Sequence, residues 1–469
     1  MTFLYVGAFD DLSVKILNEI LFSNKNIKKL VLIKLKSVSI NLIDFDEIIS
    51  YDYENLILGN YSSSQNKIDI DEYNFIHTDF FQISKMMDRI HKVFTYSFDD
   101  RYEMYLNHLK GLSNILNLTN PDYTLFTNMP HEVYDYILYK LLKYRNINTR
   151  FLLHGMQMEN YFQILSDISE NDTRLKYYND CPDELQNNSL KLIYKKNKDL
   201  NYVHFYMKDD FHPSNRLKKS ILNSFKIRWE FLKVLNKKKL FYKYMIKIVA
   251  DQIESFSTRK MVKGFIAKEI DFSKKIIFVP LNYQPELTTS PMGGAFFDQR
   301  FMIQMLSSYC PDDFQILVKD HPKQGINFGR NKSFYKSISK LDKVLLIDPN
   351  INNDLILKKS DVVAVVTGTL GFQALCNSKK VLVFGNTFFK FFKEGAFPIK
   401  NERDLIDFFE NSNFEKSFDE KQFFKFLNRC EEIFNYGFID KDYIHFSSFD
   451  MDKNAIAVAG AVYKELFNE

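Results

Sequence analysis

The sequence feature that most constrains the fold is a series of short apolar runs, each ending in a polar or glycine-containing turn. Two of these runs are Ile276–Val279 and Phe314–Val318. Apolar runs of this length, bounded by turn residues, predict buried parallel strands. Ligands of open α/β sheets bind at the carboxyl ends of the strands. We therefore expect Glu286, Lys319 and His321, which follow these runs, to lie at one edge of a sheet.

A third run, Asp361–Val366, leads into a turn of small residues that opens a helical pattern. The first turn of a helix has backbone N–H groups without helical partners, and such a turn binds anions well. The side chains of Thr367 and Thr369 add hydroxyl groups on either side of Gly368. The sequence therefore predicts a phosphate site at this turn.

These segments together resemble the bacterial capsular polysaccharide biosynthesis family. The resemblance covers roughly residues 275–400, through the loop at 280–286, the pair Gly293-Gly294, the Lys319-Asp320-His321-Pro322 turn and the Thr-Gly-Thr turn with its Gly-Phe-Gln-Ala-Leu helix. In the first half of the chain it depends on the run from Asn128 to Glu132 and on His154-Gly155.

The resemblance implies an α/β fold with two Rossmann-like domains facing a cleft, of the GT-B type, with helical insertions. It also implies transfer of an acidic sugar, such as Kdo or a sialic-type sugar, from a CMP donor to a saccharide or lipid-linked acceptor. The Asp-x-Asp spacings at 44–46 and 69–71 lie in the first half, away from the expected donor site. We therefore expect no metal and no cofactor. The Asp/Glu-Asp/Glu-Gly motif that related sialyltransferases use for their base is missing.

The resemblance and the positions at strand ends together suggest roles for particular side chains, and Glu286, Asp298 and His131 are the alternatives for the base that the missing motif would supply. The expected catalytic residues are His321, Glu286, His131 and Asp298. The expected donor-binding residues are Lys319, Pro322, Thr367, Gly368, Thr369, Gln373, Gln284, Arg300 and Glu394. The expected acceptor-binding residues are Glu132 and His154.

Several of these residues have a plainer structural interpretation. His321 can pack against Pro322 at a strand end, and Asp298 can be an ordinary acid at a helix N-terminus, where it favours the helix dipole. His131 can cap its helix, and His154 can be a core histidine. Against this, imidazoles exchange protons near neutral pH, and the guanidinium of Arg300 suits a sugar carboxylate.

Length and composition indicate a two-domain cytoplasmic protein. A chain of 469 residues exceeds one typical core. Its four cysteines have no paired spacing, its net charge of +4 is too small to imply nucleic acid, and no signal peptide or spanning stretch is visible. We expect an acceptor domain at 1–270, a donor domain at 271–440 and a C-terminal helix at 441–469 that packs on the first domain.

The segment from Arg216 to Ile248 is strongly basic, because Glu230 is its single acid. Apolar residues spaced by three and four among the lysines and arginines predict amphipathic helices between about 215 and 250, and such helices bind anionic membranes. Two ordinary surface helices are the alternative. The amphipathic interpretation predicts a peripheral contact with the inner face of the cytoplasmic membrane.

Two other functions fit the same residues. A polyol-phosphate transferase of the teichoic-acid type would use a CDP donor and would also have a His-Pro turn and a Ser/Thr-rich turn. A non-catalytic, membrane-associated component of capsule assembly is the second alternative.

Overall fold

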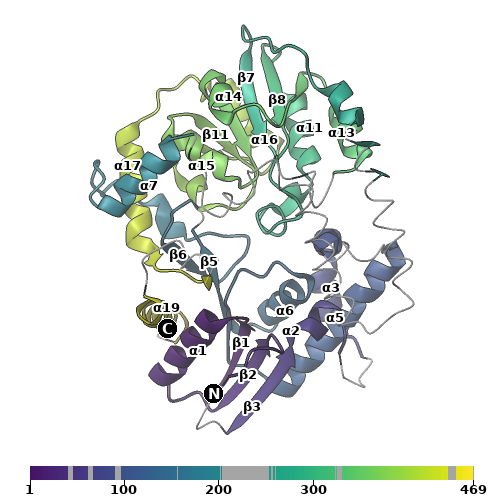
Figure 1. Cartoon of the computed structure of the whole chain (residues 1–469), viewed down its shortest axis with the longest axis vertical. Coiled ribbons are helices and arrows are strands. Elements are labelled where there is room, and N and C mark those ends of the chain that lie inside the picture. Colours follow the sequence, from purple (N-terminus) through teal and green to yellow (C-terminus); the bar gives the residue numbers. More distant parts are fainter. Residues whose placement is uncertain are drawn as a thin grey trace. The chain divides into compact units, whose positions relative to one another are not determined.

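The computed structural model of the chain describes residues 1–40, 46–61, 67–89, 97–155, 157–200, 202, 253–254, 257–258, 260–322, 324, 330–441 and 450–467. The chain divides into two compact units, Met1–Ile168 with Glu432–Glu469, and Ser169–Glu431. Each unit is built on its own sheet with helices packed against it (Figure 1). The prediction of two Rossmann-like α/β domains is thereby confirmed.

The sheet of the first unit has seven strands in the order β13-β6-β5-β4-β1-β2-β3. The strands are β1 (Thr2–Ala8), β2 (Lys29–Lys34), β3 (Glu47–Asp52), β4 (Tyr123–Phe126), β5 (Asn148–His154), β6 (Tyr161–Leu165) and β13 (Asn435–Tyr436). β1 to β5 are parallel, whereas β6 and β13 are antiparallel to their neighbours. The central strands are apolar because helices cover the sheet.

The helices of the first unit are α1 (Asp11–Ser23), α2 (Tyr53–Ile57), α3 (Ile70–His77), α4 (Phe80–Met86), α5 (Phe98–Thr119), α6 (Val133–Tyr144) and α19 (Met451–Phe467). α19 packs against α1, and the two lie side by side in Figure 1. Buried Leu12, Ile16, Val458 and Val462 join the two helices in one apolar core with β1 and β2. Residues from both ends of the described chain therefore complete this unit.

The sheet of the second unit has six parallel strands in the order β12-β11-β10-β7-β8-β9. The strands are β7 (Lys275–Pro280), β8 (Phe314–Lys319), β9 (Val344–Ile347), β10 (Val362–Val365), β11 (Lys380–Val383) and β12 (Ala396–Pro398). The helices are α7 (Asn188–Lys198), α11 (Gln299–Tyr309), α13 (Lys332–Ile338), α14 (Asn353–Lys359), α15 (Thr369–Cys376), α16 (Glu402–Glu410) and α17 (Glu420–Ile433).

The strand order of the second unit reverses next to its first strand. The chain builds β7, β8 and β9 in one direction and then crosses back, so that β10 pairs with the opposite edge of β7. In doubly wound sheets the crevice at such a reversal, outside the carboxyl ends of the two strands, is where ligands bind. The topology therefore points to the ends of β7 and β10.

The observed units differ from the boundaries expected from the sequence. We expected residues up to 270 in the first domain, but the described residues between 169 and 270 belong to the second unit. The reason is packing: α7 lies against α15, and the hydroxyl of Tyr178 donates a hydrogen bond to Glu394. The expected C-terminal helix appears as α19 in the first unit, together with residues from 432 onward.

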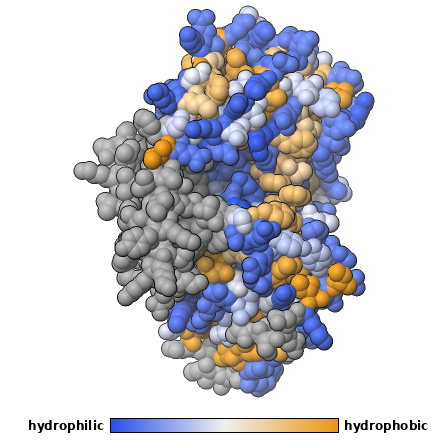
Figure 2. All heavy atoms as spheres, turned by 90° about the vertical axis from the view of Figure 1, so that its right-hand side faces the viewer, coloured by the Kyte–Doolittle hydropathy of each residue, from blue (hydrophilic) through white to orange (hydrophobic). Residues whose placement is uncertain are grey.

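The described residues give no support to a membrane span. No helix among them is long and apolar enough to cross a bilayer. Figure 2 shows hydrophobic residues interspersed with hydrophilic ones over the face that it draws. The basic segment 216–248, for which a membrane contact is expected, lies outside the described residues.

Candidate functional site

The loop that follows β7 occupies the centre of the candidate site. Asn282 lies two residues beyond the end of β7, and both of its backbone groups are held by buried side chains. Gln299 Oε1 accepts from the backbone N–H of Asn282 at 2.8 Å, and Gln299 Nε2 donates to its carbonyl oxygen at 3.0 Å. Arg330 Nη2 donates to the same oxygen at 2.7 Å. The position of Asn282 is therefore fixed from two sides.

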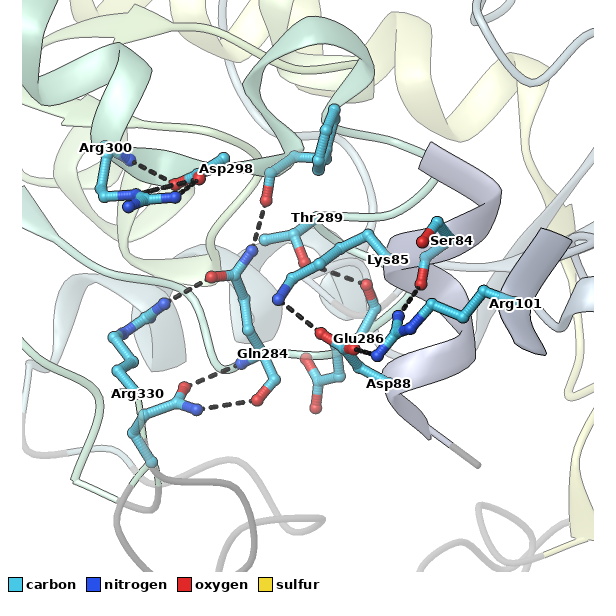
Figure 3. A network of polar contacts seen from close by, with 12 residues as sticks. Ser84, Lys85, Asp88, Arg101, Gln284, Glu286, Thr289, Asp298, Arg300 and Arg330 are labelled. Atoms are coloured by element: carbon cyan, nitrogen blue, oxygen red, sulfur yellow. Dashed lines mark hydrogen bonds and ion pairs between the residues drawn. The ribbon is translucent and has the colours of Figure 1, made fainter. Parts of the chain in front are cut away.

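Gln284, an expected donor-binding residue, is itself part of this support (Figure 3). Its side chain accepts from Arg330 and donates to the carbonyl oxygen of Phe297. Its backbone exchanges two hydrogen bonds with the Gln324 amide, at 2.8 Å and 2.7 Å. Because Gln284 is buried and its amide is engaged at both ends, it shapes the loop.

His321 follows β8, and its ring lies 5.5 Å from that of Tyr283, the residue after Asn282. His321 and Pro322 are both half-buried. Asp320 stabilises the turn, since its Oδ1 accepts a hydrogen bond from the backbone N–H of His321 at 2.8 Å and pairs with Arg330 Nε at 3.1 Å. The turn after β8 and the loop after β7 are thus joined through Arg330.

Lys319, expected beside the phosphate, is engaged elsewhere. Its ammonium donates to the carbonyl oxygen of Ile351 at 2.6 Å and to Asn353 Oδ1 at 2.5 Å, in the segment that follows β9. Burial lowers the pKa of Lys319 to about 8. The side chain therefore ties β8 to the next loop. This contact gives Lys319 a structural role that the sequence did not predict.

The two threonines of the turn after β10 have different surroundings. The Thr367 hydroxyl is buried and donates to the carbonyl oxygen of Thr288 at 2.5 Å, so that it anchors the loop 286–293. Gly368 is the N-cap of α15, and Thr369, in its first turn, is half-buried. Gln373 lies buried one turn further along the helix. Gly368 and Thr369 are thus the members of this turn that stay near the surface.

The ends of β8 and β10 are two strands apart, because β7 lies between them. With about 4.8 Å between neighbouring strands, the two ends are separated by about 10 Å. The loop after β7 spans this interval, since Tyr283 contacts the His321 ring and Asn282 approaches Gly368. The expected histidine and the expected phosphate turn are therefore connected by Asn282 and Tyr283, two residues of the loop 280–286 that were not among the expected site residues.

Asp298 and Arg300, expected to bind the donor or act in catalysis, pair with each other (Figure 3). Arg300 Nε lies 2.9 Å from both carboxylate oxygens of Asp298, and Asp298 also caps α11 by accepting from the backbone N–H of Arg300 at 3.1 Å. The charge of Arg300 is thus largely compensated within the chain. Glu286, by contrast, is exposed, and its carboxylate accepts from Thr288 Oγ1 at 3.2 Å.

Glu394 accepts a hydrogen bond from the Tyr178 hydroxyl. Burial, together with this carboxylate, raises the pKa of Tyr178. The pair connects the segment before α7 to the turn that precedes β12. It gives Glu394 a structural partner within the second unit.

The candidate residues of the first unit lie after β4 and at the end of β5. His131 Nδ1 donates to the carbonyl oxygen of Met129 at 2.7 Å, and Nε2 lies 3.8 Å from Glu132 Oε1. Burial lowers the pKa of His131, so the ring is neutral near pH 7. His154 stacks on Phe438 at 5.7 Å, and burial lowers its pKa to about 4.

Asp135 is a first-unit carboxyl that sequence reasoning missed. It lies in the first turn of α6, three residues after Glu132, which is the N-cap of that helix. Burial, together with the nearby Glu132 carboxylate, raises the pKa of Asp135 well above its usual value. Among the residues that the structure describes, Asp135 Oδ1 and Glu132 Oε2 are buried without a hydrogen-bond partner. The spacing of two acids in one helical turn is the signal that would have drawn attention to the pair.

Comparison with known families gives one match. Residues 157–393, just over half of the chain, match the family described as capsule polysaccharide biosynthesis protein. No curated protein matches the chain.

Three solved structures are among those that match the chain. UDP-GlcNAc 2-epimerase from Neisseria meningitidis is 12% identical, with 100% of each chain covered and a TM-score of 0.26. KpsC from Thermosulfurimonas dismutans, a beta Kdo 2,7 transferase, is 13% identical over 68% of this chain and 85% of that chain, with a TM-score of 0.28. UDP-GlcNAc 2-epimerase from Methanocaldococcus jannaschii is 10% identical over 92% and 99%, with a TM-score of 0.27. Similarity at this level says nothing about activity.

Proposed function

Because the chain belongs to the capsule polysaccharide biosynthesis family, we propose that it is a glycosyltransferase of surface polysaccharide synthesis. The donor is a CMP-activated ulosonic acid, such as Kdo or a sialic-type sugar, and the acceptor is a saccharide or a lipid-linked saccharide. The donor nucleotide binds in the second unit. The protein acts in the cytoplasm without a metal, and the basic segment 216–248 is its proposed contact with the membrane.

One observation carries this proposal. The loop after β7 brings Tyr283 to the ring of His321 and Asn282 to the start of α15, at the point where the strand order reverses. An imidazole and a helix N-terminus at one sheet edge suit a ligand that carries a phosphate. Leaving phosphate oxygens are where negative charge develops when a nucleotide sugar reacts.

In the proposed reaction the bond between the anomeric carbon and the donor phosphate breaks, and the acceptor hydroxyl oxygen forms the new glycosidic bond. CMP leaves with the phosphate oxygen, and His321 donates a hydrogen bond or a proton to it. The amides at the start of α15 stabilise the same phosphate.

The acceptor hydroxyl must lose its proton during transfer. In the second unit Glu286 is the best candidate base, because its carboxylate is exposed whereas Asp298 is paired with Arg300. In the first unit it is His131, because Nδ1 donates to Met129 and the neutral ring leaves Nε2 as the basic atom. Glu132 and His154 remain the proposed acceptor-binding residues.

A screen of CMP-, CDP- and UDP-activated donors with a short saccharide acceptor tests the proposal. Release of CMP from a CMP-sugar, with an acceptor that gains the mass of the sugar, is the expected result. Turnover of a UDP donor alone would overturn the donor assignment. A variant that lacks the imidazole, His321→Asn, is expected to bind the donor and to release CMP far more slowly.

The pairing of Arg300 with Asp298 favours one alternative, a polyol-phosphate transferase with a CDP donor. A neutral polyol needs no cation in its binding site, whereas the carboxylate of an ulosonic acid does. Arg300, the cation that we expected to bind this carboxylate, is already paired with Asp298. Both reactions release CMP. The product distinguishes them, because only the polyol-phosphate transferase places phosphorus in the new linkage.

A further inference from the structure

Asn282 and Gly368 approach each other at the reversal point of the second sheet. Asn282 follows β7 and Gly368 follows β10, the two strands between which the order reverses. A methyl group on the Gly368 Cα would lie 3.5 Å from Asn282 Oδ1 and 3.6 Å from Nδ2. The similar distances mean that the amide group as a whole is turned toward the start of α15.

The side chain of Asn282 is buried but makes no hydrogen bond with the described part of the chain. The residue is 8% exposed, and its Oδ1 lacks a partner there. Buried amides in folded proteins nearly always have partners. Since Gln299 and Arg330 fix the backbone of Asn282, its side chain is held in place without using its own polar atoms.

The N-terminus of α15 also differs from the starts of four other α-helices of this unit. The N-cap side chains of α11, α13, α14 and α16 each accept a backbone hydrogen bond from the first turn. At α15 the N-cap is Gly368, which has no side chain, and no side-chain hydrogen bond caps the helix. The start of α15 and the Asn282 side-chain amide thus lie next to each other.

We propose that Asn282 is a further donor-binding residue, which holds a phosphate of the nucleotide against the N-terminus of α15. Asn282 Nδ2 donates to a phosphate oxygen that also accepts from the first-turn amides. Asn282 Oδ1 accepts from a hydroxyl group of the same ligand. The inference rests on the proposed function for the identity of the nucleotide. It extends that function because it names a residue that binds the phosphate.

Two substitutions test this proposed phosphate site, formed by Asn282 and the start of α15, in different ways. Asn282→Asp keeps the shape of the side chain but replaces the donor with a carboxylate oxygen, which repels phosphate. Gly368→Ala adds one methyl group between the start of α15 and the Asn282 amide. Gly368 has φ −60° and ψ 146°, a backbone conformation open to alanine, and the nearest contact of the methyl group would be an ordinary 3.5 Å. Both variants are therefore expected to fold.

The measurement is the affinity of wild-type protein and variants for CMP, UMP and cytidine, by isothermal titration calorimetry. Gly460→Ala is the matched control, because it adds the same methyl group in α19 with nothing within 4 Å. We expect each of the two site variants to lose at least tenfold in affinity for whichever nucleotide the wild type binds, since hydrogen bonds to charged groups are the strong ones. The Gly460→Ala variant should bind as the wild type does.

The outcomes separate this inference from the proposed function. If UMP binds and CMP does not, the donor assignment fails, while the proposed phosphate site is still tested by the loss of UMP affinity in the variants. If Asn282→Asp and Gly368→Ala bind the nucleotide as tightly as the wild type, the proposed phosphate site is wrong. It is also wrong if the variants lose affinity for cytidine to the same extent, or if the wild type binds none of the nucleotides.

Discussion

The hydroxyl of Thr367 donates a hydrogen bond to the carbonyl oxygen of Thr288, 2.5 Å away, and so ties the end of β10 to the loop 286–293. The sequence suggested that this hydroxyl binds phosphate. Its burial and its partner instead make it part of the wall of the site.

Thr367→Val is accordingly expected to lower stability. Valine keeps the shape of threonine but leaves the Thr288 carbonyl unpaired, which costs about 1–3 kcal/mol. The free energy of unfolding in urea measures this loss. An unchanged stability with weakened donor binding would show that the hydroxyl serves the ligand after all.

Arg330 should be among the most sensitive positions of the second unit. Its guanidinium is buried and contacts Asp320 at 3.1 Å, the carbonyl oxygen of Asn282 at 2.7 Å and the Gln284 side chain. Arg330→Met removes the cation that pairs with the half-buried Asp320 carboxylate, and it removes one donor from the Asn282 carbonyl oxygen and one from the Gln284 side chain, so we expect a loss of about 3–5 kcal/mol. Arg403→Met is the control, because Arg403 belongs to an exposed ion pair with Asp407. Exposed pairs contribute about 0–1 kcal/mol. Equal losses in the two variants would contradict the supporting role of Arg330.

Gly385 provides a contrast with Gly368 in the same site. A methyl group at Gly385 would lie 2.6 Å from Thr367 Cγ2 and 2.9 Å from the backbone oxygen of Met292. Because a backbone atom cannot move aside easily, Gly385→Ala is expected to destabilise the second unit by about 1–3 kcal/mol. Gly368→Ala should leave the melting temperature unchanged. The comparison fails if both variants melt at the wild-type temperature.

His321→Asn should lower the rate of transfer and spare donor affinity. Loss of one donor to developing charge reduces kcat by about 10²–10³ in comparable sites. The rate of CMP release and the Kd for the donor measure the two effects separately. His77→Asn serves as the control, since His77 is an exposed histidine of the first unit. Wild-type turnover by His321→Asn would instead favour a non-catalytic assembly component.

His154 should make the first unit sensitive to acid. Burial lowers its pKa from 6.5 to about 4, so the unfolded chain takes up the proton more readily than the folded one. Its contribution is therefore fully present above pH 6.5 and is lost as the pH falls toward 4, with a loss of about 2 kcal/mol by pH 5. His154→Phe keeps the ring beside Phe438 and should reduce the difference in unfolding free energy between pH 7 and pH 5. An unchanged difference would contradict this assignment.

The strands that carry the site could be predicted from the sequence, because short apolar runs between turns have few other solutions. The predicted run 276–279 is β7 (Lys275–Pro280), and 314–318 is β8 (Phe314–Lys319). The order of the strands could not be predicted, since the pattern of each run is the same wherever it lies in the sheet. The position of β7 between β8 and β10 is what makes Asn282 central.

The hydrogen-bond partners of the polar side chains could not be predicted from the sequence either. Lys319 was expected at a phosphate because it precedes His321, yet it donates to Ile351 and Asn353, more than thirty residues further along the chain. Arg330 was not considered, although it joins the two loops of the site. Residue type and spacing indicate which chemistry is available, whereas the long-range packing decides which groups remain available for a ligand.

The contact between α1 and α19 has a consequence for how this protein is made. Residues 451–467 complete the core of the unit that begins with β1, but the ribosome adds them only after the whole of Ser169–Glu431. The apolar surface of α1 that α19 covers therefore stays without this partner until residues 451–467 have been synthesised.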